Sequence, residues 1–299
     1  MTDITIRKLY EAGAHFGHQT RYWSPKMSPY IYGKHNHIHI IDLDIALPLY
    51  KTAFRYIESE VAKGKMVLFV GTKRAALEST RTHAERCGSP YINHRWFGGT
   101  LTNFKTIRQS VRRYVDMDID YNQDVHKNLD KKQQQKYLRE LNTLRRNFEG
   151  IKDMSRLPDI LFVVDIGYEN IAVQEANKLN IPVVGVVDTN NSFDNIDYIL
   201  PGNDDASMAV NIYLSAAADA VLRGKEKQGM DAGAGESGLP EEAPASEKKA
   251  QPQSKQESVS EAPLPAEAQT GSAGEAESTT SEAAAPVQSP DKLKKDGDS

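Results

Sequence analysis

Two short runs of consecutive apolar residues, ILFVVD at 160–165 and PVVGVVD at 182–188, constrain the fold of this chain more than any other feature. Both are rich in β-branched side chains and lack a polar-apolar alternation, which is typical of strands covered on both faces. Two further runs of this kind are MVLFVG (66–71) and YILPG (198–202). IHIID (38–42) and YINHRW (91–96) are weaker strand candidates.

Segments with helical periodicity separate these runs. They span residues 43–64, 73–88, 168–180 and 205–224, and Gly64, Gly88 and Gly224 stand where helix C-terminal caps are expected. Strands that alternate with helices favour a parallel sheet with helices on both faces. We therefore predict a Rossmann-like α/β fold.

One segment interrupts the alternation. Apolar residues recur at helical spacing from Phe104 to Tyr114 and again from Leu138 to Ile151, with a polar stretch between them. This pattern predicts an inserted antiparallel coiled-coil hairpin over 102–152. Lys105 to Lys152 contain 12 basic and 7 acidic residues, a net charge of +5. The α/β domain is then discontinuous, with parts at 1–101 and 153–228.

The charge is divided unevenly along the chain. From residue 231 to the C-terminus there are 6 basic and 14 acidic residues, whereas residues 1–230 hold 31 basic and 27 acidic ones. A basic body suggests a polyanionic partner, although a solvated surface of mixed charge gives the same balance. The segment 229–299 is rich in Ala, Glu, Ser and Pro and has no aromatic residue. We expect this acidic tail to be disordered because it has too little apolar surface to bury.

The compartment is indicated by what the sequence lacks. Cys87 is the single cysteine, so no disulfide can form within the chain, and its place at the end of an expected helix favours a structural thiol. No apolar run reaches the roughly 20 residues of a membrane span, and the N-terminus has no signal-like apolar core. We expect a soluble, cytoplasmic protein.

Motifs for catalysis are sparse. The sequence has no G-x-x-x-x-G-K-[ST] loop and no G-x-G-x-x-G. FVGTKRAA at 69–76 places Lys73 and Arg74 at an expected helix N-terminus, where a phosphate contact is plausible. No Ser/His/Asp or Cys/His grouping has a telling spacing. These residues indicate a binding protein, with a nucleotide- or metal-dependent enzyme as the alternative.

Two clusters raise the question of a metal ion. His35, His37 and His39 alternate in HNHIH, but no carboxylate or cysteine supports them nearby. The second cluster could hold a divalent ion at the carboxyl edge of the sheet, although helix capping and Asx-turns also account for its members. It comprises Asp188, Asp194, Asp197, Asp204 and Asp205. We favour the structural interpretation of both clusters and predict neither a metal site nor a cofactor.

The stretch RWFGGTLTNF at 95–104 lies where the sheet passes into the inserted hairpin. Gly98 and Gly99 permit positive φ or a close backbone approach, and Thr100 or Thr102 is a candidate cap for the first hairpin helix. We expect Trp96 and Phe97 to wedge the hairpin base against the α/β domain and Arg95 to face an RNA phosphate; packing alone could also account for all three.

Aromatic rings and cations interleave in the N-terminal stretch LYEAGAHFGHQTRYWSPKMSPYIYG at 9–33. Pro25 and Pro29 rule out a continuous helix. Flat rings stack on unpaired bases and cations meet phosphates, so this stretch suits RNA, although the rings could also cover a sheet edge.

The sequence resembles the S-two family of bacterial small-ribosomal-subunit proteins over about residues 4 to 225. The motifs that carry the resemblance are AGAHFGHQTRYWSPKMSPYIYG, HIIDL, FVGTKRAA, RWFGGTLTNF, LPDILFVVDIGYENIAVQEANKLNIPVVGVVDTN and DYILPGNDDA. The resemblance implies a Rossmann-like domain with an inserted coiled-coil hairpin and a structural, non-enzymatic component of the 30S subunit. It implies binding to the small-subunit rRNA, to neighbouring ribosomal proteins and to the large mRNA-binding protein S-one, in the cytoplasm on the ribosome.

Charge and position select the residues expected to contact RNA phosphate or sugar, without base readout. They are Arg21, Lys26, Lys34, Lys73, Arg74, Arg95, Lys105, Arg108, Arg112 and Arg113.

Overall fold

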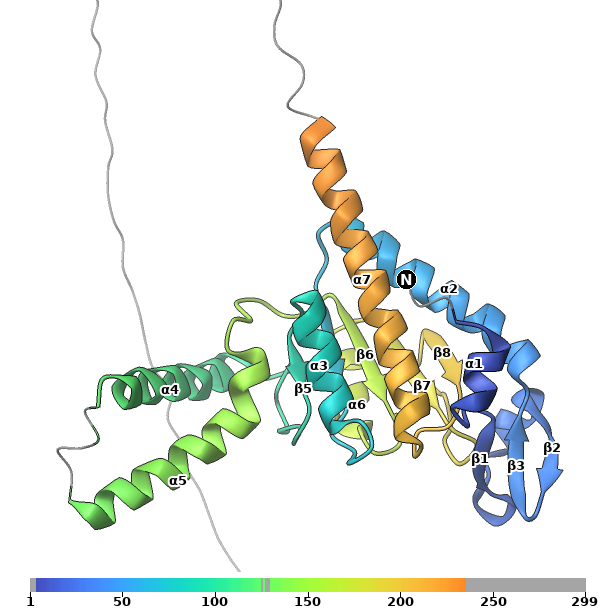
Figure 1. Ribbon diagram of the computed structural model, residues 1–299, viewed down its shortest axis with the longest axis horizontal. Helices are drawn as coiled ribbons and strands as arrows, with labels where there is room; N and C mark the ends of the chain where they lie inside the picture. The colour runs from blue at the N-terminus through green and yellow to red at the C-terminus, as the bar shows by residue number, and fades with distance from the viewer. Residues whose placement is uncertain (1–3, 125, 127–129, 235–299) are drawn as a thin grey trace, which may run out of the picture. The chain divides into compact units, whose positions relative to one another are not determined.

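A five-stranded parallel sheet forms the centre of the fold (Figure 1). The computed structural model describes residues 4–124, 126 and 130–234, all within one compact unit. The strand order is β5-β4-β6-β7-β8. The bounds are β4 Val67–Val70, β5 Tyr91–Ile92, β6 Ile160–Val164, β7 Val183–Val187 and β8 Tyr198–Pro201. The predicted α/β class with a parallel sheet is confirmed.

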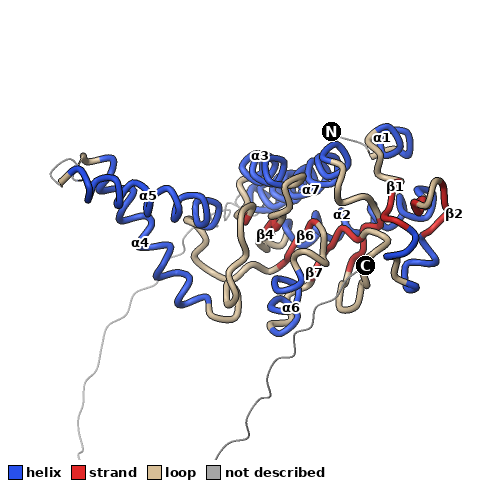
Figure 2. The backbone as a smooth tube through the Cα atoms, turned by 90° about the horizontal axis from the view of Figure 1, so that it is seen from below, coloured by secondary structure: helices blue, strands red, loops and turns tan. Residues whose placement is uncertain are grey.

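Helices cover both faces of the sheet, as Figure 2 shows for α3 and α7 on one side and α6 on the other. Alternate strand residues divide between two apolar cores: Phe69 and Phe162 belong to the core shared with α2, α3 and α7, whereas Leu68 and Leu161 face α6 and the inserted helices. Burial of every residue in β4, β6 and β7 explains why their sequences are continuously apolar. The helix bounds are α2 Leu43–Ala62, α3 Leu77–Cys87, α6 Asn170–Lys178 and α7 Ser207–Ala234.

The inserted segment forms two helices, α4 Phe104–Asn122 and α5 Lys131–Phe148, followed by the short 3-10 helix η4 Glu149–Ile151. The helices lie next to each other in Figure 1, and Tyr137 of α5 donates a hydrogen bond to the carbonyl of Met117 in α4 over 2.5 Å. Buried Ile107 and Leu141 join the core on the α6 face of the sheet. The two helices are as predicted; a coiled-coil geometry and the domain boundaries stay predictions.

The N-terminal stretch holds more regular structure than the sequence indicated. After α1 (Ile6–Glu11), the strands β1 (Phe16–Gln19), β2 (Ile31–His35) and β3 (Ile38–Ile41) form an antiparallel sheet of order β1-β3-β2. Two 3-10 helices, η1 Thr20–Tyr22 and η2 Pro25–Tyr30, lie between β1 and β2. The strand β1 escapes sequence reasoning because it has four residues and no apolar alternation.

Two of the three glycine caps are confirmed and one is wrong. Gly88 adopts the left-handed conformation at the end of α3, and Gly64 follows α2 with φ of +81°. Gly224 instead lies within α7, where a Cβ atom would stand 2.8 Å from the carbonyl oxygen of Glu58 in α2. Close packing of two helices, not a helix end, requires this glycine.

Other bounds also differ from the predictions. The helix α3 begins at Leu77, so Lys73 and Arg74 lie in the preceding turn. Only Tyr91–Ile92 of YINHRW is strand, and α7 continues past Gly229, where the tail was expected to begin. The tail beyond Ala234 lies outside the described residues. Within the described part of the chain, no helix is long and apolar enough to cross a membrane.

Candidate nucleic-acid interface

The loop RWFGGTLTNF wraps around the carboxylate of Glu175 in α6. One carboxylate oxygen, Oε1, accepts hydrogen bonds from the Trp96 indole N–H over 3.1 Å and the Gly99 amide over 2.7 Å. The other oxygen, Oε2, accepts from the amides of Leu101 and Thr102 over 2.9 and 3.0 Å and from the Thr102 hydroxyl over 3.1 Å. Five donors therefore converge on one buried side chain and fix the shape of the loop.

The charge of Glu175 is stabilised by these donors. Burial by itself would raise the pKa of Glu175, but the hydrogen bonds from Thr102, Trp96, Gly99 and Leu101 outweigh it and hold the pKa below its ordinary value. The capping role expected of Thr100 or Thr102 is wrong. The N-cap residue of α4 is Asn103, whose side chain accepts no backbone amide of the helix, and both threonine hydroxyls are engaged elsewhere.

The two aromatic residues of the loop attach the base of the inserted helices to the sheet. Trp96 is buried in the core on the α6 face. Phe97 stacks on Phe148 at the end of α5, with ring centroids 5.4 Å apart. This geometry supports the predicted wedge. Arg95 is exposed beside them, with its guanidinium carbon 5.7 Å from the centre of the Phe97 ring.

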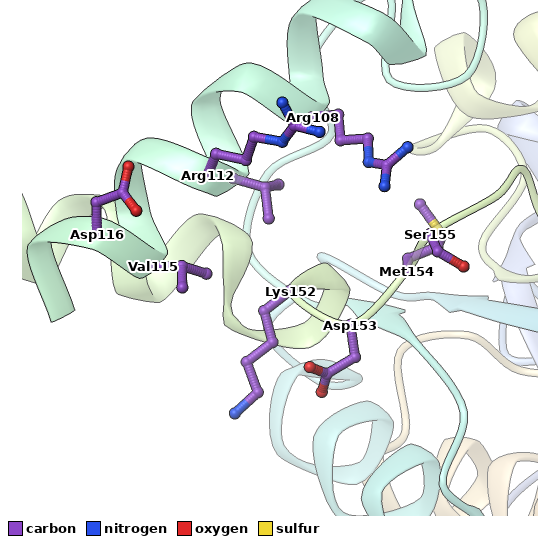
Figure 3. Close-up of a pocket in the computed structure, with 9 residues that line it drawn as sticks. Arg108, Arg112, Val115, Asp116, Lys152, Asp153, Met154 and Ser155 are labelled. Atoms are coloured by element: carbon purple, nitrogen blue, oxygen red, sulfur yellow. The ribbon is translucent and has the colours of Figure 1, made fainter. Parts of the chain in front are cut away.

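Basic side chains border a pocket of about 210 Å³ between α4 and the segment that follows η4. Arg108 and Arg112 project from α4 at its rim, and Lys152 lies on the opposite side (Figure 3). Asp116 and Asp153 also line the pocket, so the local charge is mixed but positive. Lys105, one turn before Arg108, is exposed as well.

The N-terminal stretch displays rings and cations together. Arg21 lies over the ring of Tyr22, 4.5 Å from its centre, and both are exposed. Tyr32 of β2 is 79% exposed, so its ring is open to solvent. Lys34 is exposed two residues further along β2. Flat rings beside cations are available to an unpaired nucleotide strand here.

Three of the ten predicted residues are already paired within the protein. Lys26 forms an ion pair with Asp194, and Arg113 forms one with Glu140. Lys73 is engaged most strongly, by several carboxylates at once. The other seven are exposed and form no ion pair with any described residue: Arg21, Lys34, Arg74, Arg95, Lys105, Arg108 and Arg112.

A separate cluster of ionisable side chains lies at the carboxyl edge of the large sheet. Lys73 Nζ is 3.1 Å from Asp165, 2.7 Å from Asp204 and 2.6 Å from Asp205. His18 Nδ1 is 2.9 Å from Asp188, whose hydrogen bond raises the pKa of His18 to about 9. Burial raises the pKa of Asp204 to about 7.

The structure separates Asp194 and Asp197 from the other three aspartates that the sequence grouped, which meet around His18 and Lys73. Asp194 pairs with Lys26, and Asp197 accepts a hydrogen bond from the Val183 amide over 2.8 Å. Asp204 and Asp205 do not cap α7; Asn203 accepts the amides of Asp205 and Ala206 over 2.8 and 3.1 Å.

The histidines of HNHIH do not share one face of a single strand. His35 ends β2, His37 lies in the turn with φ of +62°, and His39 belongs to β3. Figure 1 shows β2 and β3 as separate strands of one hairpin. The preference for no metal site in HNHIH stays a prediction.

Sequence reasoning missed Glu175, and it missed the carboxylate partners of His18. Glu175 lies between Ala172 and Ala176 on the buried side of α6, so a carboxylate on an apolar helix face was the available signal. Burial of such a group requires several hydrogen-bond partners, which points to a nearby loop. The pairing of His18 with aspartates gave no local signal because these partners lie more than 150 residues away in sequence.

Comparison with known proteins places this chain in a family. The family model described as ribosomal protein S2 matches residues 9–224. The small ribosomal subunit protein uS2 of Marinobacter nauticus is 51% identical over 232 residues, which cover 78% of this chain and 93% of that protein. The exposed basic loop and helix thus lie within the matched region. The chain belongs to the ribosomal protein S2 family of the small ribosomal subunit.

Proposed function

We propose that this chain is a structural constituent of the 30S subunit that binds small-subunit rRNA and neighbouring ribosomal proteins. The observation that carries the RNA contact is the exposed set Arg95, Lys105, Arg108 and Arg112, displayed on one loop and the helix that follows it without an ion pair to any described residue. Such cations displace counterions from phosphates, and nothing in their arrangement selects particular bases.

The fixed loop supports this proposal. Glu175 holds the backbone from Gly99 to Thr102. Arg95 and the first turn of α4 therefore keep a fixed position relative to the sheet. A fixed backbone reduces the conformational freedom that the chain loses when its cations bind phosphates. We assign phosphate or sugar contacts on the loop and α4 to Arg95, Lys105, Arg108 and Arg112.

A second contact region is proposed on the N-terminal sheet. Arg21 and Lys34 supply cations, and Tyr22 and Tyr32 supply exposed rings. Arg74 is exposed near the carboxyl edge of the large sheet and completes the set. Lys26, Lys73 and Arg113 also stay proposed contacts, but each must first leave a carboxylate, so their contributions are expected to be the smallest.

Contact with the mRNA-binding protein S-one, a location on cytoplasmic ribosomes and the lack of an enzymatic role are proposed from the family resemblance. Small subunits assembled without this chain should then carry less S-one. A panel of nucleotides and divalent ions tests the enzymatic alternative, since a catalytic pocket for nucleotides would raise the melting temperature with ATP or GTP.

The principal experiment follows tagged protein through a sucrose gradient of lysate at low and high magnesium. Signal that travels with the small subunit after the ribosomes separate supports the structural role; signal that remains at the top of the gradient contradicts it. Arg108→Ala/Arg112→Ala should weaken association without lowering the melting temperature. The matched control Arg7→Ala/Arg81→Ala removes two exposed arginines that form i,i+4 ion pairs and should associate normally.

Salt dependence gives a quantitative check with purified protein and small-subunit rRNA. Each lost phosphate contact should reduce the slope of log K against log salt by about 0.7 to 0.9. The Arg108/Arg112 double variant should therefore lose about 1.5 from the slope. An unchanged slope would remove both arginines from the interface.

A further inference from the structure

The N-terminal sheet carries a small pocket that the proposed phosphate contacts leave unused. It lies where the segment between β1 and β2 meets the β2–β3 hairpin, and its volume is about 230 Å³. Pockets for drug-sized ligands measure about 300 to 1,000 Å³, so this one suits a single flat ring system. The residues that line it are Trp23, Ser28, Ile31, Gly33, Lys34 and His39.

Two ring systems contribute to the lining. The centroids of the Trp23 indole and the His39 imidazole are 5.2 Å apart, and the ring planes are inclined by 38°. Trp23 is 38% exposed, so part of its ring is accessible to a ligand. Every nucleobase has a flat face that can stack on such a ring. The two rings therefore give the pocket the character of a stacking site.

His39 supplies an independent sign of a missing partner. Both of its ring nitrogens are shielded from solvent, and neither has a hydrogen-bond partner among the described residues. A neutral imidazole carries one N–H donor and one acceptor nitrogen, and shielded polar atoms are rarely left without a partner. The edge of an unpaired nucleobase offers both donors and acceptors, so it can supply what the imidazole lacks.

Gly33 keeps the pocket open. A Cβ atom at this position would meet no heavy atom within 4 Å, and the φ angle of Gly33 is not positive. Neither the backbone conformation nor close packing therefore requires a glycine here. The missing side chain instead leaves free space in β2 beside the other lining residues.

The segment that carries Trp23 is fixed before any ligand arrives. The Ser24 amide donates to the carbonyl of Thr189 over 2.7 Å, and the Met27 amide donates to the carbonyl of Ser24 over 3.0 Å. The Met27 side chain is fully buried. Because the backbone next to Trp23 is already held, a ligand that stacks on the indole costs little further conformational freedom.

The charge around the pocket favours a nucleotide over a neutral ring. Among the described residues of the lining, Lys34 alone has a fixed charge; it is exposed and forms no ion pair with any described residue. Arg21 is also exposed, two residues before Trp23. No carboxylate lines the pocket. A neutral aromatic side chain from another protein would use the rings and leave both cations without a counterpart, whereas a nucleotide brings a phosphate to them.

We propose that this pocket receives one unpaired nucleobase of the small-subunit rRNA, stacked on Trp23, with Lys34 at an adjoining phosphate. The inference rests on the proposed rRNA-binding function and adds a base contact to a set of phosphate and sugar contacts. His39 hydrogen-bonds the edge of the base and holds its plane. Stacking accepts any of the four bases, so the pocket requires an unpaired position and not a particular sequence.

The test measures the affinity of the full chain and its variants for purified small-subunit rRNA over a range of salt concentrations. Trp23→Ala removes the stacking ring, and Gly33→Val fills the pocket while Trp23 and His39 stay in place. Each should weaken binding about tenfold at every salt concentration. The slope of log K against log salt should not change, because neither variant removes a charge. Trp23→Phe keeps a ring and should recover most of the affinity.

Two matched controls exclude a general effect of substitution. Tyr168→Ala removes an exposed ring that belongs to no proposed contact. Gly229→Val adds the same side chain as Gly33→Val, at a position where a Cβ atom also meets nothing within 4 Å. Both should bind rRNA as the unaltered chain does, and all variants should keep its melting temperature within a few degrees.

Fluorescence reports the stacking directly. A single-stranded RNA of about eight nucleotides should quench the emission of Trp23, whereas an abasic strand of the same length should not. Trp96, the second of the two tryptophans, is buried in the core, so Trp23→Phe should abolish the quenching. Equal quenching by the abasic strand would contradict a stacked base.

The rRNA titrations separate the pocket from the wider function. If the unaltered chain binds with a steep salt dependence and Trp23→Ala and Gly33→Val bind equally well, the pocket proposal is overturned and the rRNA-binding function stands. Poor entry of these two variants into small subunits would then assign the pocket to a neighbouring protein. If the unaltered chain does not bind rRNA at all, both the function and the pocket proposal fail.

Discussion

Replacement of Glu175 by glutamine isolates the contribution of the carboxylate that organises the RWFGGTLTNF loop. A glutamine keeps the size of the side chain but has one acceptor oxygen and one amide donor. When the oxygen of the glutamine side chain faces the amides of Leu101 and Thr102, its NH₂ group faces the N–H groups of Trp96 and Gly99. One buried donor, on Trp96, and one partly buried donor, on Gly99, then lack an acceptor, and each costs about 1 to 3 kcal/mol.

The expected loss is therefore about 4 kcal/mol, a large part of the roughly 5 to 15 kcal/mol typical of a folded domain. Urea unfolding followed by tryptophan fluorescence measures it, since Trp96 itself is buried beside the changed group. The melting temperature should fall by about 8 to 16 °C. Glu11→Gln, which disrupts only an exposed i,i+4 pair with Arg7, should cost less than about 0.5 kcal/mol.

The stabilisation by Glu175 should also depend on pH. Because the folded pKa of Glu175 lies below its ordinary value, its stabilisation is present above the ordinary carboxyl range and is lost as the pH falls through the folded pKa. The difference in unfolding free energy between the unaltered chain and Glu175→Gln should therefore shrink in acid. A loss below about 1 kcal/mol at neutral pH would refute this reasoning and leave the apolar contacts of Trp96 and Phe97 as the restraint on the loop.

Three further predictions concern helix packing, acid stability and thiol reactivity. Gly224→Ala should destabilise the protein by about 1 to 3 kcal/mol, because the new methyl group collides with α2. In the control Gly229→Ala, in the same helix, the methyl group meets nothing within 4 Å and should stabilise the protein slightly. Equal shifts of the melting temperature in the two variants would contradict the packing argument. Hydrogen bonds from Lys63 and Lys65 lower the pKa of buried Glu60, so its contribution to folding stability is lost as the pH falls below about 4.5. In Glu60→Gln the free energy of unfolding should therefore fall less steeply with decreasing pH in this range. Burial raises the pKa of the Cys87 thiol, so an aromatic disulfide reagent should react with it only after urea unfolding; rapid labelling of the native protein would show that α3 opens.

The sequence by itself determined the α/β class, the parallel sheet and the two inserted helices. Runs such as 160–165 and 182–188 carry that information locally, because a strand buried on both faces must be apolar throughout. The same holds for the Gly88 cap, whose left-handed conformation follows from one residue at the end of one helix. Local periodicity and local conformational preference are sufficient for these features.

Only the tertiary structure decided which charged side chains meet. Glu175 and Gly99 are brought together by the packing of α6 under the loop, and His18 and Asp188 by the approach of β1 to the end of β7. Lys73 looks like a free cation in the sequence and is held by three aspartates in the fold. A charge is recognised in sequence by its own residue type, but its partner is fixed by contacts between distant segments, which no local pattern records.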